Sequence, residues 1–409
     1  RYVDAAFRAR SARIIPVSAR ARFIRMGIPA DVVDDTLGRI RRANHWSSQW
    51  VETAQRFLGD FRRQTSAANV REAAQARQLA ALCYHAAQIF EPFDPMTVRK
   101  CRSASASLFT QALPQLHPNV RHLWIPWRSK SLPVYFELPE RVSEPVGLVV
   151  ILNGASMSKE ETFAWRGQLI DHGYAVILMD SPGTGEATSV GSIGPDQNDI
   201  LDGVFEMFRN QPMIDLSRVV ALGASLGGNQ AIRAAAHDRR IMAAVAVTPP
   251  YDPARWIHRA SPLLQAELGL IVDDKLVPEA RDMVAGFSLA DVSLASRQPV
   301  LIFGGGRDVI VPPTEAQLLA KRVGGRATLV WYPTGGHCLY ELVDQWMFEA
   351  AVWIDAVAHV QRSGGLQDNP TKVAAVAAEA LELAEYAPKS GPNDWETGEE
   401  LGEYARLLT

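Results

Sequence analysis

The sequence predicts an α/β protein: a mostly parallel sheet flanked by helices, preceded by an N-terminal α-helical module. The first observation is that apolar residues between about 20 and 115, such as Val33, Leu37 and Ile40, recur at helical spacing opposite a charged face. The second is that, from residue 119 onward, short apolar runs ending in Gly, Pro or Ser alternate with helical or loop sequence. Such runs are typical of buried parallel strands.

The elements follow in order along the chain. Segment 69–95 reads as an Ala-rich helix stopped by Pro92 and Pro95, so residues 1–118 are expected to form a helical module that covers the site. A hairpin then opens a catalytic domain over 119–362, within which the long stretch 249–298 is expected to add helices at the sheet's C-terminal edge. A Gly/Pro-containing linker leads to a C-terminal helical extension over 363–409.

Composition excludes several classes of protein. The 409 residues are 47% hydrophobic and 21% charged, with 42 Lys and Arg against 45 Asp and Glu, and no dense basic run suggests a nucleic-acid partner. Three scattered cysteines predict neither a disulfide framework nor a zinc site. No apolar stretch has the length of a membrane span. We therefore expect a cytoplasmic protein with no metal, organic cofactor, nucleic-acid partner or membrane partner.

A serine between a predicted strand and a predicted helix is the candidate nucleophile. Gly223-Ala-Ser225-Leu-Gly227 satisfies the Gly-x-Ser-x-Gly pattern, in which a sharp turn exposes the serine hydroxyl and small flanking residues let the backbone nearly touch itself. The alternative is a tight turn with an incidental serine. A phosphate-binding loop is disfavoured because no Lys-Ser/Thr follows the glycines. Ser225 is therefore the predicted nucleophile.

A serine needs a base near neutral pH, and the base needs a carboxylate that fixes its tautomer. Asp308 and His337 each follow a predicted strand, in the chain order Ser, acid, His that this kind of sheet requires. Asp308 has an alternative role as a cap of the helix that follows it. Asp180 is a rival acid, but it precedes the serine and opens a Pro-Gly turn, so we expect it to hold that turn together.

The tripeptide Gly-Ala-Ser also occurs earlier in the chain, at 154–156, directly after another predicted strand. Ser156 is a poor nucleophile candidate because Ser158 stands where the second glycine is needed. The loop after this strand is where such folds supply an oxyanion-hole N–H, so the backbone N–H groups of Ala155 and Leu226 are the predicted donors. An ordinary polar loop is the alternative for 154–156.

Five residues are candidates for the walls of a substrate pocket. Tyr251 and Trp256 follow a predicted strand, and Ser156 follows the oxyanion loop. His45 and Trp46 in the helical module are candidate wall residues or proton donors, but aromatic residues at helical spacing more often pack against neighbouring helices.

Five blocks together resemble the α/β-hydrolase superfamily, namely "VVILNGASMSKEE", "MDSPGTGEA", "GASLGGNQAIRAAA", "GGGRDVIVPP" and "PTGGHCLYE". The Ser158-Lys159-Glu160 segment after the oxyanion strand and the helical "ALCYHAAQIF" are similar to the group of the fermentation-respiration-switch protein and 2,6-dihydroxypseudooxynicotine hydrolase. The resemblance covers residues 30–360. It implies an α/β-hydrolase fold, a site between the helical module and the catalytic domain, and cleavage of carbon–carbon bonds next to ketones, or of ester-like bonds, in small aromatic or polyketide molecules. The chain departs from the group at Asn153-Gly154-Ala155, where relatives often show Gly-Gly-Leu, and beyond residue 365.

The prediction is therefore a serine hydrolase that acts on a small molecule without a cofactor, with homodimerisation left open. An acyltransferase or an ester-eliminating lyase of secondary metabolism would use the same site. A binding protein with a vestigial site is a further alternative. An oligopeptidase is disfavoured because its usual N-terminal partner is a β-propeller, whereas residues 20–115 read as helices.

Overall fold

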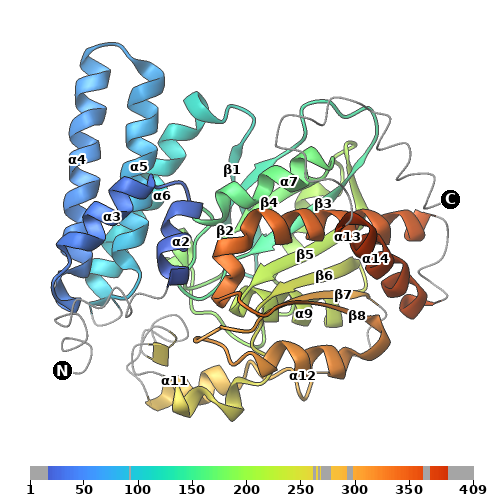
Figure 1. The fold of residues 1–409 in the computed structure, drawn as a ribbon. Helices are drawn as coiled ribbons and strands as arrows, with labels where there is room; N and C mark the ends of the chain where they lie inside the picture. The colour runs from blue at the N-terminus through green and yellow to red at the C-terminus, as the bar shows by residue number, and fades with distance from the viewer. Residues whose placement is uncertain are drawn as a thin grey trace.

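The computed structural model describes residues 17–91, 94–260, 264–265, 268, 278–292, 298–362 and 369–385. The predicted α/β architecture is confirmed: a helical region stands beside an eight-stranded sheet that carries helices on both faces (Figure 1). Much of the predicted helical insertion, namely 261–263, 266–267, 269–277 and 293–297, lies outside the described residues, as do 386–409.

The helical region packs around large aromatic side chains. Its helices are α2 (Val17–Arg25), α3 (Ala30–Arg39), α4 (Trp46–Ser66), α5 (Val70–Gln88) and α6 (Pro95–Leu116). Phe23 lies 5.0 Å from Trp50 and 5.8 Å from Trp46, measured between ring centroids, and all three are buried. The small side chains of α5 let α4 and α6 approach it closely, which gives the region a dense core of its own.

Eight strands form one sheet. They are β1 (Arg121–Trp127), β2 (Lys130–Glu137), β3 (Val146–Leu152), β4 (Ala175–Met179), β5 (Ile214–Ala224), β6 (Ile241–Val247), β7 (Val300–Gly305) and β8 (Ala327–Tyr332). Their order across the sheet is β1-β2-β4-β3-β5-β6-β7-β8. The predicted hairpin of β1 and β2 is antiparallel and β2 also pairs antiparallel with β4, whereas β3 to β8 pair in parallel. The carboxyl ends of the parallel strands therefore share one edge, where ligands bind in such sheets.

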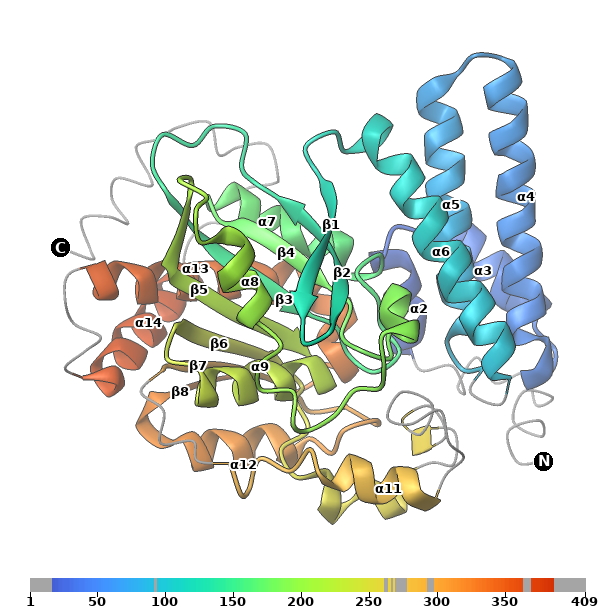
Figure 2. The ribbon, with the colours of Figure 1, turned by 180° about the vertical axis from the view of Figure 1, so that it is seen from behind.

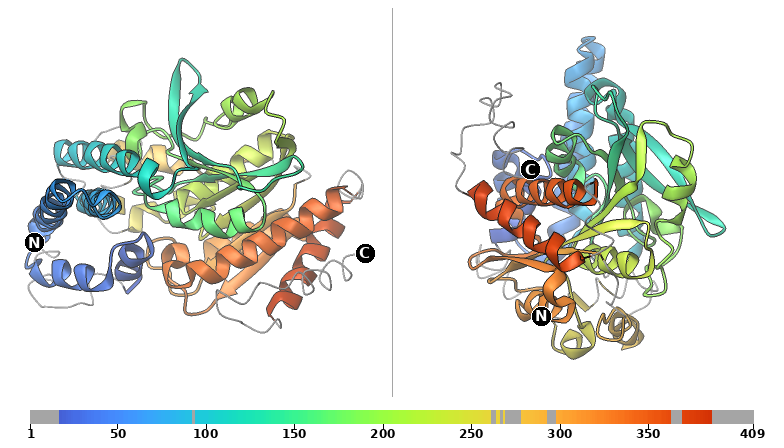
Figure 3. Two further views of the ribbon diagram at one scale, coloured as in Figure 1. Left: turned by 90° about the horizontal axis from the view of Figure 1, so that it is seen from above. Right: turned by 90° about the vertical axis from the view of Figure 1, so that its right-hand side faces the viewer.

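Helices cover both faces of the sheet (Figures 2 and 3), and each face packs into a buried apolar layer. On one face lie α7 (Arg166–Asp171), α13 (Val343–Arg362) and α14 (Pro370–Glu385), and on the other lie α8 (Asp202–Phe208), α9 (Leu226–His237) and α12 (Thr314–Val323). The first layer is continuous with the core of the helical region, since Trp46, Phe109 and Phe163 belong to one buried cluster with it. The helical region and the sheet therefore share a core at the edge where the strands end.

The region between β6 and β7 contains the short helix α11 (Pro278–Ala285) and two single turns, Pro253–Arg255 and Ile257–Arg259. Asn229 of α9 ties this region to the sheet because its side-chain amide donates to the backbone oxygens of Pro250 and Phe287, both at 2.8 Å. Within the described ranges, no helix has both the length and the apolar character needed to cross a membrane.

Candidate active site

Ser225 occupies a strained turn between β5 and α9. Its backbone has φ 54° and ψ −123°, a conformation that a residue with a Cβ rarely adopts. Two hydrogen bonds hold it there: Ser225 N donates to Val247 O at 2.8 Å, and Ser225 O accepts from Asn229 N at 3.2 Å. Neighbouring structure thus maintains a turn that exposes the serine side chain at the end of the sheet.

The two glycines that flank Ser225 permit this turn because other backbone passes where a side chain would lie. A Cβ on Gly223 would sit 2.3 Å from the carbonyl carbon of Gly227, and a Cβ on Gly227 would sit 2.2 Å from Leu152 O. These separations are shorter than any real carbon contact. The Gly-x-Ser-x-Gly spacing therefore has a direct steric cause, and it brings the end of β3 against the turn at Ser225, which is named the nucleophile turn after the predicted role of that serine.

His337 and Asp308 meet across the ends of two neighbouring strands. His337 begins the short helical segment His337–Leu342 after β8, and its Nδ1 lies 2.7 Å from Asp308 Oδ2 in the loop after β7. The other oxygen, Asp308 Oδ1, accepts backbone N–H groups of Ile310 at 2.8 Å and Val311 at 2.9 Å. The aspartate thus holds the loop that follows it and contacts the histidine. The alternative role as a helix cap is wrong, because the N-cap of α12 is Pro313 and no side chain caps that helix.

Electrostatics at His337 favour a proton on the imidazole. Burial by itself lowers the pKa of His337, but the Asp308 carboxylate outweighs it and raises the pKa above its ordinary value. The neighbouring backbone is strained, with positive φ at Cys338 (58°) and Leu339 (50°). Thr248, which the sequence did not single out, holds this strained segment: its hydroxyl accepts from Cys338 N at 3.0 Å. Thr248 directly follows β6, and the end of a parallel strand is a position where site residues are expected from the sequence.

The first Gly-Ala-Ser forms a tight turn that lies against Ser225. Met157 N donates to Gly154 O at 3.2 Å, which makes Ala155 and Ser156 the two central residues. Among the described residues, the Ala155 N–H has no acceptor. A Cβ on Gly154 would lie 3.4 Å from Ser225 Cβ. The predicted donor Ala155 therefore sits next to the nucleophile turn with its N–H unused.

The second predicted donor, Leu226, is the first residue of α9. The N–H groups of a helix's first turn have no acceptor within the helix and carry the positive end of its dipole. The Leu226 N–H therefore has no acceptor within α9 and lies next to Ser225, and its role as an oxyanion donor stays a prediction.

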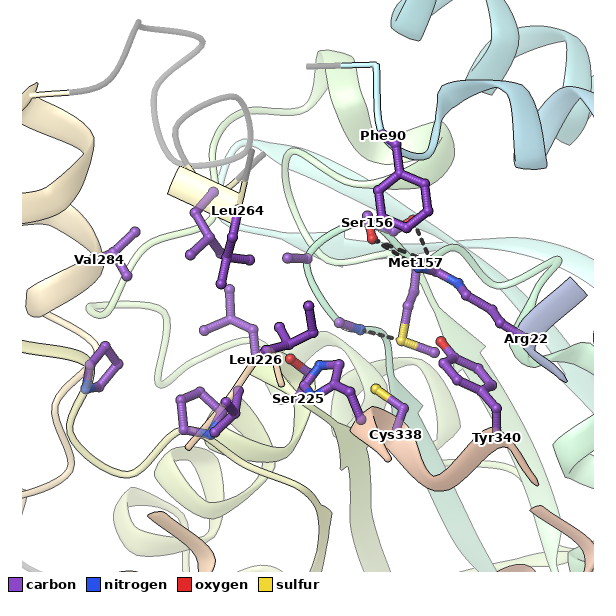
Figure 4. Close-up of a pocket in the computed structure, with 18 of the residues that line it drawn as sticks. Arg22, Phe90, Ser156, Met157, Ser225, Leu226, Leu264, Val284, Cys338 and Tyr340 are labelled. Atoms are coloured by element: carbon purple, nitrogen blue, oxygen red, sulfur yellow. Dashed lines mark hydrogen bonds between the residues drawn. The ribbon is translucent and has the colours of Figure 1, made fainter. Parts of the chain in front are cut away.

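Ser225 and His337 line one pocket, which contains about 910 Å³ not filled by protein atoms, part of it open to solvent. Figure 4 shows Leu264 and Val284 on one side and Arg22 and Phe90 on the other, with Ser225 between them. The remaining lining is mostly apolar and includes Leu226, Pro250, Pro253, Leu268, Ile310, Val311, Met157, Cys338 and Tyr340. This pocket therefore favours an apolar small molecule.

The predicted wall residues divide into two groups. Ser156 and Trp256 line the pocket, whereas Tyr251, His45 and Trp46 are not among its lining residues. Tyr251 packs instead against the core on the α9 side of the sheet. Trp46 is buried within the helical region, where its indole N–H donates to Ala86 O at 2.8 Å. The helical region reaches the pocket through Arg22 and Phe90, which the sequence reasoning missed.

The rival acid Asp180 belongs to a separate buried cluster. Its Oδ1 accepts from Lys159 N at 2.7 Å and its Oδ2 accepts from Glu186 N at 2.9 Å. Lys159 Nζ lies 3.0 Å from Asp180, 2.8 Å from Glu160 and 2.7 Å from Glu186. Asp180 thus fastens its own turn to the segment after β3, as the sequence predicted.

Comparisons with known proteins show which family the chain resembles. The family model "Esterase FrsA-like" matches residues 16–253, and the prolyl oligopeptidase family model matches residues 161–359. A 2,6-dihydropseudooxynicotine hydrolase of Paenarthrobacter nicotinovorans is 26% identical over 310 residues, which cover 76% of this chain and 83% of the relative. The hydrolyase poxO of Penicillium oxalicum is 36% identical over 154 residues, 35% of this chain and 36% of that protein.

Comparison with solved structures shows similarity to the same hydrolase. The crystal structure of the 2,6-dihydroxy-pseudo-oxynicotine hydrolase superposes with a TM-score of 0.72 at 26% identity, covering 82% of this chain and 95% of that one. AbyA5 superposes with a TM-score of 0.65 at 20% identity, covering 90% of this chain and 99% of that one, which shows a shared fold. The FrsA-like model spans the helical region, the nucleophile turn and the turn at 154–157, which is named the oxyanion turn after its predicted role. Because this model covers more than half of the chain, the chain is an α/β-hydrolase that belongs to the FrsA-like esterase family.

Proposed function

We propose that this protein is a serine hydrolase that cleaves a carbon–carbon bond next to a ketone, or an ester bond, in a small, largely apolar molecule. The observation that carries the proposal is the arrangement around Ser225: its hydroxyl and His337 line one pocket, and Asp308 lies 2.7 Å from His337 Nδ1. This is the arrangement by which a serine is made nucleophilic.

In the proposed reaction, His337 takes the hydroxyl proton as Ser225 adds to the substrate carbonyl. The negative oxygen that forms accepts the Ala155 and Leu226 N–H groups, and each such donor contributes about 3 kcal/mol to the transition state. Collapse of the adduct breaks the bond to the leaving group, which takes the proton from His337. An ester releases an alcohol in this way. A ketone releases a carbon leaving group, whose electron pair is delocalised into an adjacent aromatic ring or second carbonyl group until that carbon takes the proton. Water then repeats the sequence on the acyl-enzyme and releases the acid.

The pocket supports the choice of substrate class. Leu264, Val284, Phe90 and Val311 line it together with Ser225, so most of its wall is hydrocarbon. An aromatic or polyketide-like molecule would bury its apolar surface against this wall. The relative from Paenarthrobacter nicotinovorans, named for a pseudooxynicotine substrate, supports a small ring-containing molecule.

Hydrolysis is tested against its alternatives by following water into the product. With an aryl ester or aryl ketone substrate and water labelled with heavy oxygen, a hydrolase places the label in the product acid. Label-free product, formed by transfer to an added alcohol or by elimination, would identify an acyltransferase or a lyase and overturn the hydrolase assignment. If the protein binds such molecules without turning over any tested ester or ketone, and Ser225→Ala binds them equally well, the result would instead support a binding protein.

A further inference from the structure

A buried ion pair joins the helical region to the segment after the oxyanion turn. Arg22 of α2 donates to both oxygens of Glu161, from Nε at 2.8 Å and from Nη2 at 2.7 Å, and the side chains are 10% and 1% exposed. Glu161 also accepts the Tyr340 hydroxyl at 2.6 Å and lies 2.6 Å from His85 Nε2. One carboxylate thus links α2, α5 and the segment that carries His337.

The same arginine holds the oxyanion turn. Arg22 Nη2 donates to Ser156 O at 3.1 Å, and both terminal nitrogens lie 3.3 Å from Ser156 Oγ (Figure 4). Gln88 of α5 donates to the same carbonyl at 2.9 Å and is itself held by Arg102 Nε at 3.1 Å. The Ser156 carbonyl therefore accepts two hydrogen bonds, and both donors come from the helical region.

The sheet side of the turn is held independently. Asn153 Nδ2 donates to Met157 O at 3.1 Å, and Met157 N closes the turn on Gly154 O. The Met157 N–H and the Ser156 carbonyl belong to one peptide, which is therefore held at its nitrogen by Gly154 O and at its oxygen by Arg22 and Gln88. Gly154 O belongs to the peptide that carries the Ala155 N–H, so a shift of the Ser156 carbonyl passes to that N–H through the hydrogen bond of the turn.

The stability of the fold gives only a weak reason for burying the Arg22–Glu161 ion pair. Apolar packing often stabilises a core as much as a buried ion pair does, so the value of such a pair lies in the geometry that it imposes. The charges persist through the working pH range: burial raises the pKa of Glu161, but Arg22 and His85 outweigh it and lower the pKa to about 2. The pKa of Arg22 is raised by Glu161 despite burial. The pair therefore acts as a fixed support.

We propose that Arg22 is a positioning residue of this active site: held by Glu161, it fixes the Ser156 peptide so that the Ala155 N–H points at the oxyanion. The inference rests on the proposed serine mechanism and gives the helical region a role in catalysis beyond covering the pocket. Gln88 assists as the second donor. Transition-state stabilisation should then depend on both side chains, and ground-state binding should not.

The test compares Arg22→Lys, Arg22→Met and Gln88→Met with wild type in the full chain. Lysine retains a charge for Glu161 but lacks the guanidinium fork that also reaches Ser156, while Gln88→Met leaves the ion pair intact. Arg20→Met is the matched control, since Arg20 lies on the same helix and makes the same two-point contact with Asp34, at 2.7 and 2.8 Å, on the exposed surface.

Two readouts separate positioning from folding. One is kcat and KM on p-nitrophenyl butyrate per titrated active site. The other is the rate of inactivation by a fluorophosphonate, whose phosphoryl oxygen occupies the oxyanion hole. We expect kcat and the inactivation rate to fall together, by about tenfold in Arg22→Lys and Gln88→Met and about a hundredfold in Arg22→Met. KM should stay within about twofold of wild type, and Arg20→Met should match wild type in both readouts.

Three results would overturn the proposal: unchanged kcat and inactivation rate in Arg22→Lys and Gln88→Met, a change confined to KM, or a loss that disappears once activity is counted per folded active site. Each of these leaves wild-type labelling at Ser225 intact. Failure of the proposed serine mechanism itself would appear earlier, as wild-type protein that the fluorophosphonate does not label at Ser225.

Discussion

The two Gly-Ala-Ser copies have the same residues but different structures. In the copy at 223–225, the first two residues end β5 and the serine stands at φ 54° before α9. The copy at 154–156 follows β3 and forms a β-turn. The two face each other, since a Cβ on Gly154 would lie 3.0 Å from Ala224 O. The residues that follow decide the difference: Leu-Gly-Gly lets a helix start against β3, whereas Met-Ser-Lys leads into a buried charged segment.

Removing the serine of the second copy should have the largest effect. Ser225→Ala leaves no hydroxyl to form an acyl-enzyme, so kcat on an aryl ester should fall by at least about 10,000-fold. The midpoint temperature of thermal unfolding should stay near the wild-type value, because alanine removes none of the backbone hydrogen bonds that hold the turn. Activity within about tenfold of wild type would show that Ser225 is not the nucleophile.

Asp308→Asn tests whether catalysis by Ser225 depends on the acid and the histidine that follow it in the chain. An amide cannot stabilise the imidazolium and can hold the wrong tautomer of His337, which costs about 10,000-fold in kcat in comparable triads. Steady-state kinetics of Asp308→Asn measure this, with Asp180→Asn as a buried comparison whose effect should appear first as lowered thermal stability. Equal kcat losses in the two variants, without a stability difference, would contradict the assignment.

The pH dependence of kcat/KM tests whether Asp308 raises or lowers the pKa of His337. Only neutral His337 can accept the serine proton, and Asp308 raises the pKa of His337, so activity should be lost as pH falls through a midpoint above that of an ordinary histidine. Asp308→Asn should move this midpoint of kcat/KM to lower pH. A midpoint that does not move, or that moves upward, would mean that another group controls the acid limb.

Crowding the first copy should have a smaller effect. In Gly154→Ala the new methyl group would lie 2.9 Å from Met157 Sδ and 3.0 Å from Ala224 O, so the turn must shift away from the nucleophile. We expect kcat to fall between about tenfold and about a hundredfold with little change in KM. Gly167→Ala is the control, because nothing lies within 4 Å of a Cβ there. An unchanged kcat in Gly154→Ala would show that the turn at 154–156 does not supply a donor to the oxyanion.

Ser156→Ala should have the smallest effect. It removes a hydroxyl that lies 3.3 Å from Arg22 but keeps the backbone carbonyl that Arg22 and Gln88 bind. A reduction in kcat of less than about tenfold is expected in the same ester assay. A loss as large as that of Ser225→Ala would reverse the roles of the two serines.

Local pattern predicted much of this molecule. The strands ended where their apolar runs ended, and Asp308 and His337 could be paired because both follow parallel strands that leave at one edge. Arg22 could not be predicted, because it lies 134 residues from Ser156 and differs from the exposed Arg20 by a helix rotation that only packing decides. Trp46 likewise has the chemistry of a pocket wall, but the packing of α4 directs it into the helical core.

The central claim is that Ser225 is the nucleophile and that its double at 156 is not. Intact-protein mass spectrometry after fluorophosphonate treatment tests this directly in wild type, Ser225→Ala and Ser156→Ala. Wild type and Ser156→Ala should each gain one adduct, mapped by peptide fragmentation to Ser225, and Ser225→Ala should gain none. An adduct on Ser156, or labelling of Ser225→Ala at the wild-type rate, would contradict the claim.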